Sequence, residues 1–230
     1  SDFNFHKTSL TGDKICLAQR GQINLMPGDF TYHSFKLAAN VFPKNVLLNI
    51  NDNVLQDTNA YNAYTNQIKD LVSYGCRIDI MGSQMHLFNP QQSRDIAEGK
   101  HIKTPEQIWD KMKNLSKVEL PIHLSEVTIP APGTDAESNE IQAVIVRNLY
   151  RIWFSVKNMM GITWWNVVDD CGEPGQVTTS GLFTRNMEPK PSFYALDRLI
   201  NEEWKTRDVL KVKEDGTVRF RGFKGRYVVC

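Results

Sequence analysis

The sequence predicts an α/β fold built on a parallel β-sheet, and three observations lead to this prediction. Short apolar segments alternate with longer amphipathic ones, in the order of one helix followed by four strand–helix pairs, which is typical of parallel strands covered by helices. The short segments are apolar on both faces, as buried parallel strands are. No glycine-rich phosphate loop of the G-x-G-x-x-G or G-x4-G-K-[ST] type occurs, which argues against nucleotide binding. An open, flavodoxin-like sheet and half of a barrel both fit this pattern.

The predicted strands are short, β-branched runs bounded by turn residues. They cover residues 46–50, 78–88, 121–129 and 160–168. The predicted helices carry one apolar face each and cover residues 30–42, 60–74, 104–115, 141–155 and 190–204. The third helix begins T-P-E-Q, a cap followed by proline at the first helical position.

The predicted elements divide the chain into three parts. Residues 1–28 form an irregular lead-in, and residues 29–204 hold the first helix and the four strand–helix units. Residues 205–230 are predicted as a small β extension, with short strands over 209–229 around the turn residues Asp215 and Gly216.

The composition is that of an ordinary globular protein. The chain has 230 residues, of which 41% are hydrophobic and 23% charged, and a formal net charge of +1. A charge this close to zero gives no electrostatic reason to expect nucleic acid or an anionic membrane as a partner. No apolar run approaches the roughly 20 residues that a membrane-spanning helix needs, and the first residues lack the pattern of a signal peptide.

No metal site and no cofactor are expected. The cysteines match no zinc pattern, and free thiols are a simpler expectation than two disulfides for a core-forming chain of this size. The histidines lie at no ligand spacing such as H-x3-H. His123 should face away from Leu124 and Thr128, since successive residues of a strand point to opposite faces. The cysteines are Cys16, Cys76, Cys171 and Cys230.

Polar and aromatic side chains gather at the carboxyl ends of the predicted strands, where parallel α/β folds place their active sites. Asn51 ends the first strand, and Gln84 and His86 share one face of the second. Glu126 ends the third, and Trp165 lies on the fourth. Amides and carboxylates hydrogen-bond hydroxyl groups, and an indole packs against a pyranose ring. Together these groups favour a sugar site, at which a carboxylate can attack the anomeric carbon.

Taken one at a time, these residues have simpler structural explanations. The carboxylate could form an ion pair with a loop, and the amide and imidazole could satisfy each other. Trp164 and Trp165 are adjacent and point to opposite faces, so at least one should pack against a helix. Asp169 and Asp170 could cap the turn that follows the fourth strand. The joint placement on successive strand ends is what favours a sugar site.

Five motifs occur in a fixed order: LLNINDN, IMGSQMHLF, LPIHLSEVTI, GITWWNVVD and PKPSFYALDRLI. In order and spacing they resemble the later strands of glycoside hydrolase family 10, chiefly endo-β-1,4-xylanases. The resemblance spans most of the chain and implies a (β/α)8 TIM-barrel type fold, of which the chain supplies about the last four βα units. It implies a hydrolase of xylan or related polysaccharides in plant cell walls. It also implies work outside the cytoplasm, as a secreted, periplasmic or cell-surface protein.

The resemblance assigns a role to each strand-end residue. It makes Glu126 the catalytic nucleophile and His86 the histidine that contacts the nucleophile carboxylate. Gln84 then contacts the sugar next to the cleaved bond, and Trp165 lines the glycone subsites. Asn51 lies near the substrate groove.

The sequence also departs from the family pattern. Thr128 stands where the family usually has an aspartate that supports the histidine, and a hydroxyl cannot stabilise a charged imidazole as a carboxylate can. Asn53 lies near the position of a usual tyrosine, and the run CGEPGQVTTSG lacks a further tryptophan. The W-D-x-x-N-E motif that carries the general acid/base is absent.

A retaining glycosidase needs two carboxyl groups about 5 to 5.5 Å apart, so this chain alone should not hydrolyse an unactivated glycoside. We expect it to be part of a longer enzyme whose other barrel half carries the acid/base. Alternatives are that the chain pairs with another polypeptide or with itself, or that it is a half barrel that binds carbohydrate without catalysis. In a further alternative it is a non-carbohydrate α/β domain, in which all these polar residues are structural.

Overall fold

A parallel four-stranded sheet forms the centre of the computed structural model, which describes residues 30–53, 58–100, 102–172, 174–223 and 225–228. The strands pair in the order β1-β2-β3-β4, which is also their order along the chain. They are β1 (Asn49–Asp52), β2 (Ile80–His86), β3 (Ile122–Thr128) and β4 (Met159–Trp164). The predicted parallel α/β architecture is therefore confirmed.

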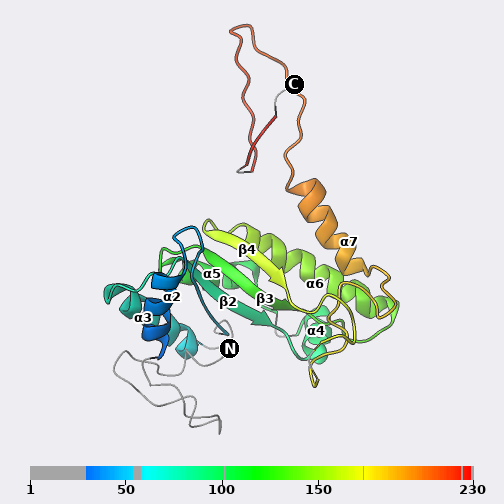
Figure 1. Cartoon of the computed structure of the whole chain (residues 1–230). Helices are drawn as coiled ribbons and strands as arrows, with labels where there is room; N and C mark the ends of the chain where they lie inside the picture. The colour runs from blue at the N-terminus through cyan, green and yellow to red at the C-terminus, as the bar shows by residue number, and fades with distance from the viewer. Residues whose placement is uncertain (1–29, 54–57, 101, 173, 224, 229–230) are drawn as a thin grey trace.

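Helices lie between successive strands, before β1 and after β4. Figure 1 shows α5 (Pro105–Ser116) and α6 (Ala136–Phe154) together on one side of the sheet. All five predicted helices are present, and α6 begins earlier than predicted. The Asp135 carboxylate caps it by accepting a hydrogen bond of 2.9 Å from the backbone N–H of Ser138. The helices are α2 (Phe30–Val41), α3 (Thr58–Ser73), α4 (Pro90–Ala97), α5 (Pro105–Ser116), α6 (Ala136–Phe154) and α7 (Pro191–Arg198), which continues into the π-helical turn η1 (Leu199–Glu203).

The hydrophobic core lies between the sheet and its covering helices. Ile50, Met81 and Leu124 point from three neighbouring strands into this core and are at most 1% exposed. Trp153 on α6 packs against the same cluster and is also 1% exposed. Each such side chain stabilises the fold by roughly 1.5–3 kcal/mol through burial. The opposite side of the sheet, which we call the site face, carries Gly82, Gln84 and His86.

The two outer strands hydrogen-bond on one side only. Within the described residues, β1 pairs only with β2, and β4 pairs only with β3. An open edge of a parallel sheet presents a row of unpaired N–H and C=O groups. The four strands thus form an open sheet rather than a closed barrel.

The predicted β extension is not formed in residues 205–223 and 225–228, to which the structure assigns no strand. One backbone hydrogen bond of 2.9 Å joins Lys213 to Thr217 around a turn, and Figure 1 shows the segment leading away from the sheet. An isolated two-stranded hairpin needs an apolar face to be stable. Val209 and Val228 are 98% and 87% exposed, so no core supports the predicted strands.

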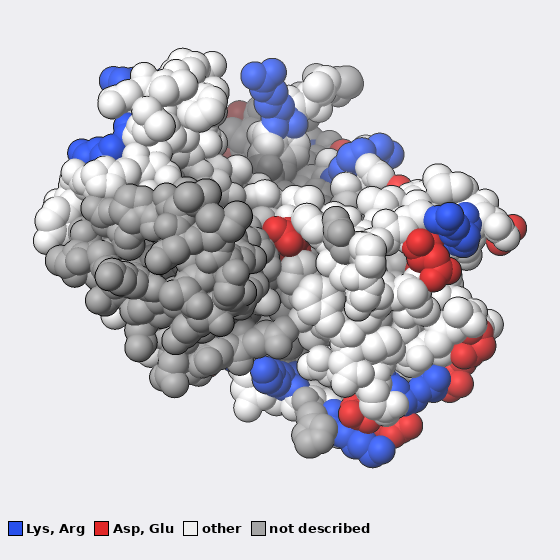
Figure 2. Space-filling view, turned by 60° about the horizontal axis from the view of Figure 1, so that its bottom comes forward, with Lys and Arg blue, Asp and Glu red and all other residues white. Residues whose placement is uncertain are grey.

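The described surface carries no strong charge of one sign on the face shown in Figure 2, where basic and acidic side chains are interspersed. Cys76 and Cys171 are free, the first buried and the second exposed. Cys16, Cys230 and the predicted lead-in over residues 1–28 lie outside the described residues. None of the helices in the described ranges combines the length and apolar character that crossing a membrane requires.

Thr104 and Gln107 form a capping box at the start of α5, as the T-P-E-Q sequence suggests. The Thr104 hydroxyl accepts from the Gln107 N–H at 3.3 Å, and the Gln107 side chain accepts from the Thr104 N–H at 2.9 Å. We expect Thr104→Ala to lower the free energy of unfolding by about 1 kcal/mol in urea titrations, and Thr104→Ser to retain it. Equal stability of the alanine variant and the wild type would show that the cap contributes nothing.

Candidate active site

Glu126 is the centre of a polar cluster at the carboxyl ends of β2 and β3. Its Oε1 accepts a hydrogen bond of 3.1 Å from Nε2 of Gln84, and its Oε2 lies 3.2 Å from Nε2 of His86. Gln84 and His86 are each 3% exposed, whereas the Glu126 side chain keeps 18% of its surface exposed. Two buried donors therefore orient a carboxylate that remains accessible.

A β-bulge in β3 places Glu126 on the site face. In a regular strand Leu124 and Glu126 would share a face, and Leu124 is buried in the core. The register skips one residue, because Ser83 pairs with Leu124 while the next residue, Gln84, pairs with Glu126. Ser125 is the extra residue of the bulge, and beyond it Glu126 shares the face of Gln84.

The same bulge overturns one expectation about His123. This residue pairs with Gly82 and therefore lies on the site face, opposite to Leu124 as predicted. Thr128 pairs with His86, so it also lies on the site face, and the prediction that it faces away from His123 was wrong. The ring of His123 contacts Thr163 at 2.8 Å, and partial burial lowers the pKa of the ring.

Thr128 holds the second nitrogen of the His86 ring. Its Oγ1 lies 2.9 Å from Nδ1 of His86, and Thr128 is fully buried. The hydroxyl can donate to Nδ1, which lets the imidazole donate from Nε2 to Glu126 while it stays neutral. An aspartate at this position would instead favour the charged imidazolium.

Aromatic rings flank the cluster. Phe88 stacks on His86 with ring centroids 4.4 Å apart and an interplanar angle of 16°. Trp165 and His86 form a T-shaped contact with ring centroids 6.3 Å apart, and Trp165 is 42% exposed. Trp164 packs against the core on the other side, and its indole N–H donates to the Asn166 carbonyl at 2.8 Å. The predicted opposition of the two indoles is confirmed.

Asn51 lies on the site face, and no described hydrogen bond joins it to Glu126. Its Oδ1 accepts a hydrogen bond of 2.5 Å from the hydroxyl of Ser125. The structure thus brings Gln84, His86 and Glu126 into direct contact. Asn51 contacts Ser125, the residue that precedes Glu126 in the chain. Sequence reasoning missed Ser125, since strand alternation alone gives no sign of a bulge.

Asp169 organises the loop that follows β4. Each of its carboxylate oxygens lies 3.1 Å from the ammonium of Lys190, and Oδ1 also accepts from the Gly181 N–H at 2.7 Å. Lys190 is 2% exposed, and burial lowers the pKa of its ammonium while Asp169 opposes this shift. The structural explanation of Asp169, as a residue that holds the loop, therefore applies.

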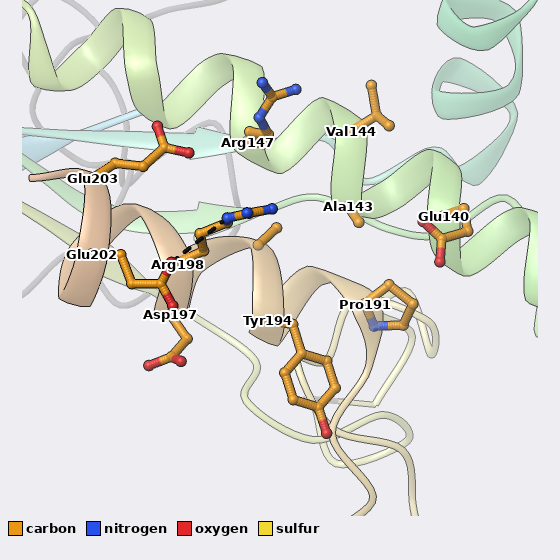
Figure 3. A pocket seen from close by; sticks show the side chains of 11 residues that line it. Glu140, Ala143, Val144, Arg147, Pro191, Tyr194, Asp197, Arg198, Glu202 and Glu203 are labelled. Carbon is orange, nitrogen blue, oxygen red and sulfur yellow. Dashed lines mark ion pairs between the residues drawn. The ribbon is translucent and has the colours of Figure 1, made fainter.

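A hollow of about 650 Å³ lies elsewhere, between α6 and α7 (Figure 3). Arg198 and Glu202 form an ion pair at its rim, with 3.7 Å between the closest atoms, and none of the predicted site residues lines it. Among the described residues, no group of three or more His, Cys, Asp and Glu side chains is arranged to hold a metal ion. The predicted site residues gather instead around Glu126 at the ends of β2 and β3.

Curated and solved relatives are xylanases. Endo-1,4-beta-xylanase B of Thermotoga neapolitana is 26% identical over 168 residues, which are 70% of this chain and 45% of that protein. Xylanase 10B of Thermotoga petrophila RKU-1, solved in complex with xylobiose, superposes with a TM-score of 0.61 at 21% identity. Xylanase 10B of Thermotoga maritima superposes with the same TM-score at 22% identity. In both cases 80% of this chain covers 54% of the solved one.

The chain therefore spans about half the length of the relatives that it matches. Together with the parallel strand–helix units, the superposition confirms the predicted TIM-barrel type of fold. The model of "Glycosyl hydrolase family 10" matches residues 17–198, which include every strand of the sheet. On this match, the chain belongs to glycosyl hydrolase family 10.

Proposed function

We propose that this chain is the C-terminal, nucleophile-bearing half of a retaining endo-β-1,4-xylanase that degrades β-glycans of plant cell walls. One observation supports this most directly: the Glu126 carboxylate is oriented by Gln84 and His86, yet remains partly exposed beside Trp165. The xylanase activity of the relatives agrees with this proposal.

In the proposed reaction a Glu126 oxygen attacks the anomeric carbon of a β-linked sugar. The bond from Glu126 to the sugar forms as the glycosidic bond breaks, and the leaving oxygen takes a proton from a second carboxylic acid. Water then hydrolyses the glycosyl ester with that second group as base. Gln84 and His86 keep the carboxylate oriented for the attack, and Trp165 packs against the sugar ring.

The second carboxyl group is proposed to come from outside the described residues. No described hydrogen bond or ion pair joins Glu126 to another carboxyl group, and the chain covers 54% of the solved relatives. We propose that an N-terminal barrel half, or a second copy of the chain, pairs with the open edges of β1 and β4. Because polymeric xylan does not enter cells, we also propose that the protein acts outside the cytoplasm.

A second candidate is a non-catalytic carbohydrate-binding half barrel. The exposed indole of Trp165 beside buried hydrogen-bonding groups favours sugar binding whether or not catalysis follows. This candidate predicts binding of xylo-oligosaccharides with no covalent product and no hydrolysis by the longest native polypeptide that contains the chain.

Covalent trapping distinguishes the two candidates. A 2-fluoro-β-xylobioside with a dinitrophenolate leaving group needs little acid assistance, so the nucleophile alone can displace dinitrophenolate and keep the sugar. We expect one added glycosyl group, mapped to Glu126 by peptide mass spectrometry, on this chain and on the longest native form. Glu126→Gln should remove the label, whereas Glu137→Gln, at a side chain that is 78% exposed, should keep it. Absence of label from both wild-type forms would reject the nucleophile.

A further inference from the structure

A gap in the middle of the sheet lets two strands that are not neighbours contact each other. Gly82 lies on β2, between β1 and β3, and its missing side chain leaves space on the site face. A Cβ at this position would lie 2.6 Å from Oδ1 of Asn51 and 2.7 Å from Oδ1 of Asn49. Both asparagine side chains therefore occupy the space that any other residue at position 82 would fill.

Through this gap β1 reaches β3. Strands two apart in a sheet are separated by roughly 9 to 10 Å, which short side chains bridge only by leaning over the strand between them. Asn51 leans over Gly82, and its Oδ1 accepts the hydroxyl proton of Ser125 at 2.5 Å. Ser125 is the extra residue of the β3 bulge, so the bond holds the bulge itself.

The position of this hydrogen bond along β3 determines which β3 residue pairs with Gln84. Asn51 pairs with Gly82, two residues before Gln84. The bond keeps Ser125 near Gly82, out of the pairing with β2, and Glu126 is the residue that pairs with Gln84. Without the bulge, Ser125 would pair with Gln84. Glu126 would then pair with Met85 and turn toward the core, where an unpaired carboxylate is strongly unfavourable.

We propose that Asn51 and Ser125, bonded across Gly82, are positioning residues that hold the β3 bulge and so present Glu126 to Gln84 and His86. The inference rests on the proposed function of Glu126 as nucleophile and adds how the fold orients its side chain. It also gives Asn51 a structural role in addition to the place near the substrate groove that the resemblance implies.

Nitrogen-15 NMR of the full chain, labelled at histidine, tests the role of the Asn51–Ser125 hydrogen bond without requiring catalysis. The imidazole signals of His86 report its contact with Glu126, and Glu126→Ala gives the reference for a lost contact. Ser125→Ala and Asn51→Ala should move these signals toward the Glu126→Ala positions. Asn51→Asp keeps the acceptor oxygen and should restore the wild-type positions. Asn49→Ala, which also vacates space above Gly82 but removes no bond to Ser125, should leave them unchanged.

Wild-type His86 signals in both Ser125→Ala and Asn51→Ala would overturn the proposal that this hydrogen bond positions Glu126. Where the wild type is labelled by the 2-fluoro-β-xylobioside, Ser125→Ala should react about 10- to 100-fold more slowly, since displacement of a reacting group by about 1 Å has effects of this size. A wild type that takes no label would reject the proposed nucleophile, whereas the NMR comparison would still decide whether Ser125 and Asn51 orient Glu126.

Discussion

Replacement of Glu126 by alanine is expected to lower xylan hydrolysis by the longest native form about 10⁴-fold or more, in line with the loss of other enzymatic nucleophiles. Glu126 is the carboxylate whose two oxygens contact Gln84 and His86 while 18% of the side chain stays exposed. Without it no covalent intermediate can form, and the second carboxyl group alone cannot replace the attack. Reducing-sugar release from xylan measures the loss, with Glu137→Ala as the exposed control.

Added azide separates a lost nucleophile from a damaged fold. The space left by the Glu126 side chain is open to solvent, so azide can enter and attack the anomeric carbon of an aryl β-xylobioside in its place. The aryl oxide leaves as the carbon–azide bond forms, and the product is the α-xylobiosyl azide, with inverted configuration. We expect azide to restore aryl release only in the alanine variant. Full xylanase activity of Glu126→Ala would assign the nucleophile to another residue.

The strands were predictable because each is a short apolar run bounded by turn residues. Each of the four predicted apolar runs overlaps an observed strand, from β1 to β4. Alternation then placed Gln84 and His86 on one face correctly. These are local properties, which a sequence pattern contains directly.

The orientation of Glu126 was not predictable from alternation. In a regular β3 the residue would share the buried face of Leu124, and only the extra residue Ser125 turns it to the site face. The bulge depends on Asn51, 74 positions earlier in the chain, and on the missing side chain of Gly82. Such a dependence on three strands at once has no local sequence signature.

Two further differences have simpler causes. Helix α4 was missed although its signals are in the sequence: Asn89 caps it by accepting from the Gln91 N–H, and Pro90 takes the first helical position. Its eight residues are too few for a clear apolar period. The strands predicted over 209–229 rested on turn residues and β-branched composition alone. Composition cannot supply the packed face that a hairpin needs.

Replacement of Asp169 by alanine is expected to lower the free energy of unfolding by about 3–5 kcal/mol, because it leaves the buried ammonium of Lys190 without its counter-charge. Lys190 is 2% exposed, and both oxygens of Asp169 lie 3.1 Å from it. The variant also loses the 2.7 Å hydrogen bond from the Gly181 N–H. Denaturant titration of the full chain near neutral pH measures the loss.

A double variant and a pH series identify the buried charge as the cause. Asp169→Ala combined with Lys190→Met removes both charges and should recover much of the stability, since an apolar replacement of a buried pair is often neutral.

Burial lowers the pKa of Lys190 below its usual 10.5, so the unfolded chain binds the proton more tightly than the folded one. Stability linked to this group must then rise with pH toward 10.5. Loss of Asp169 lowers the folded pKa further and widens that window. The deficit of Asp169→Ala relative to the wild type should therefore shrink as the pH approaches 10. A deficit that stays constant with pH and is not reduced by Lys190→Met would instead assign the loss to the hydrogen bond with Gly181.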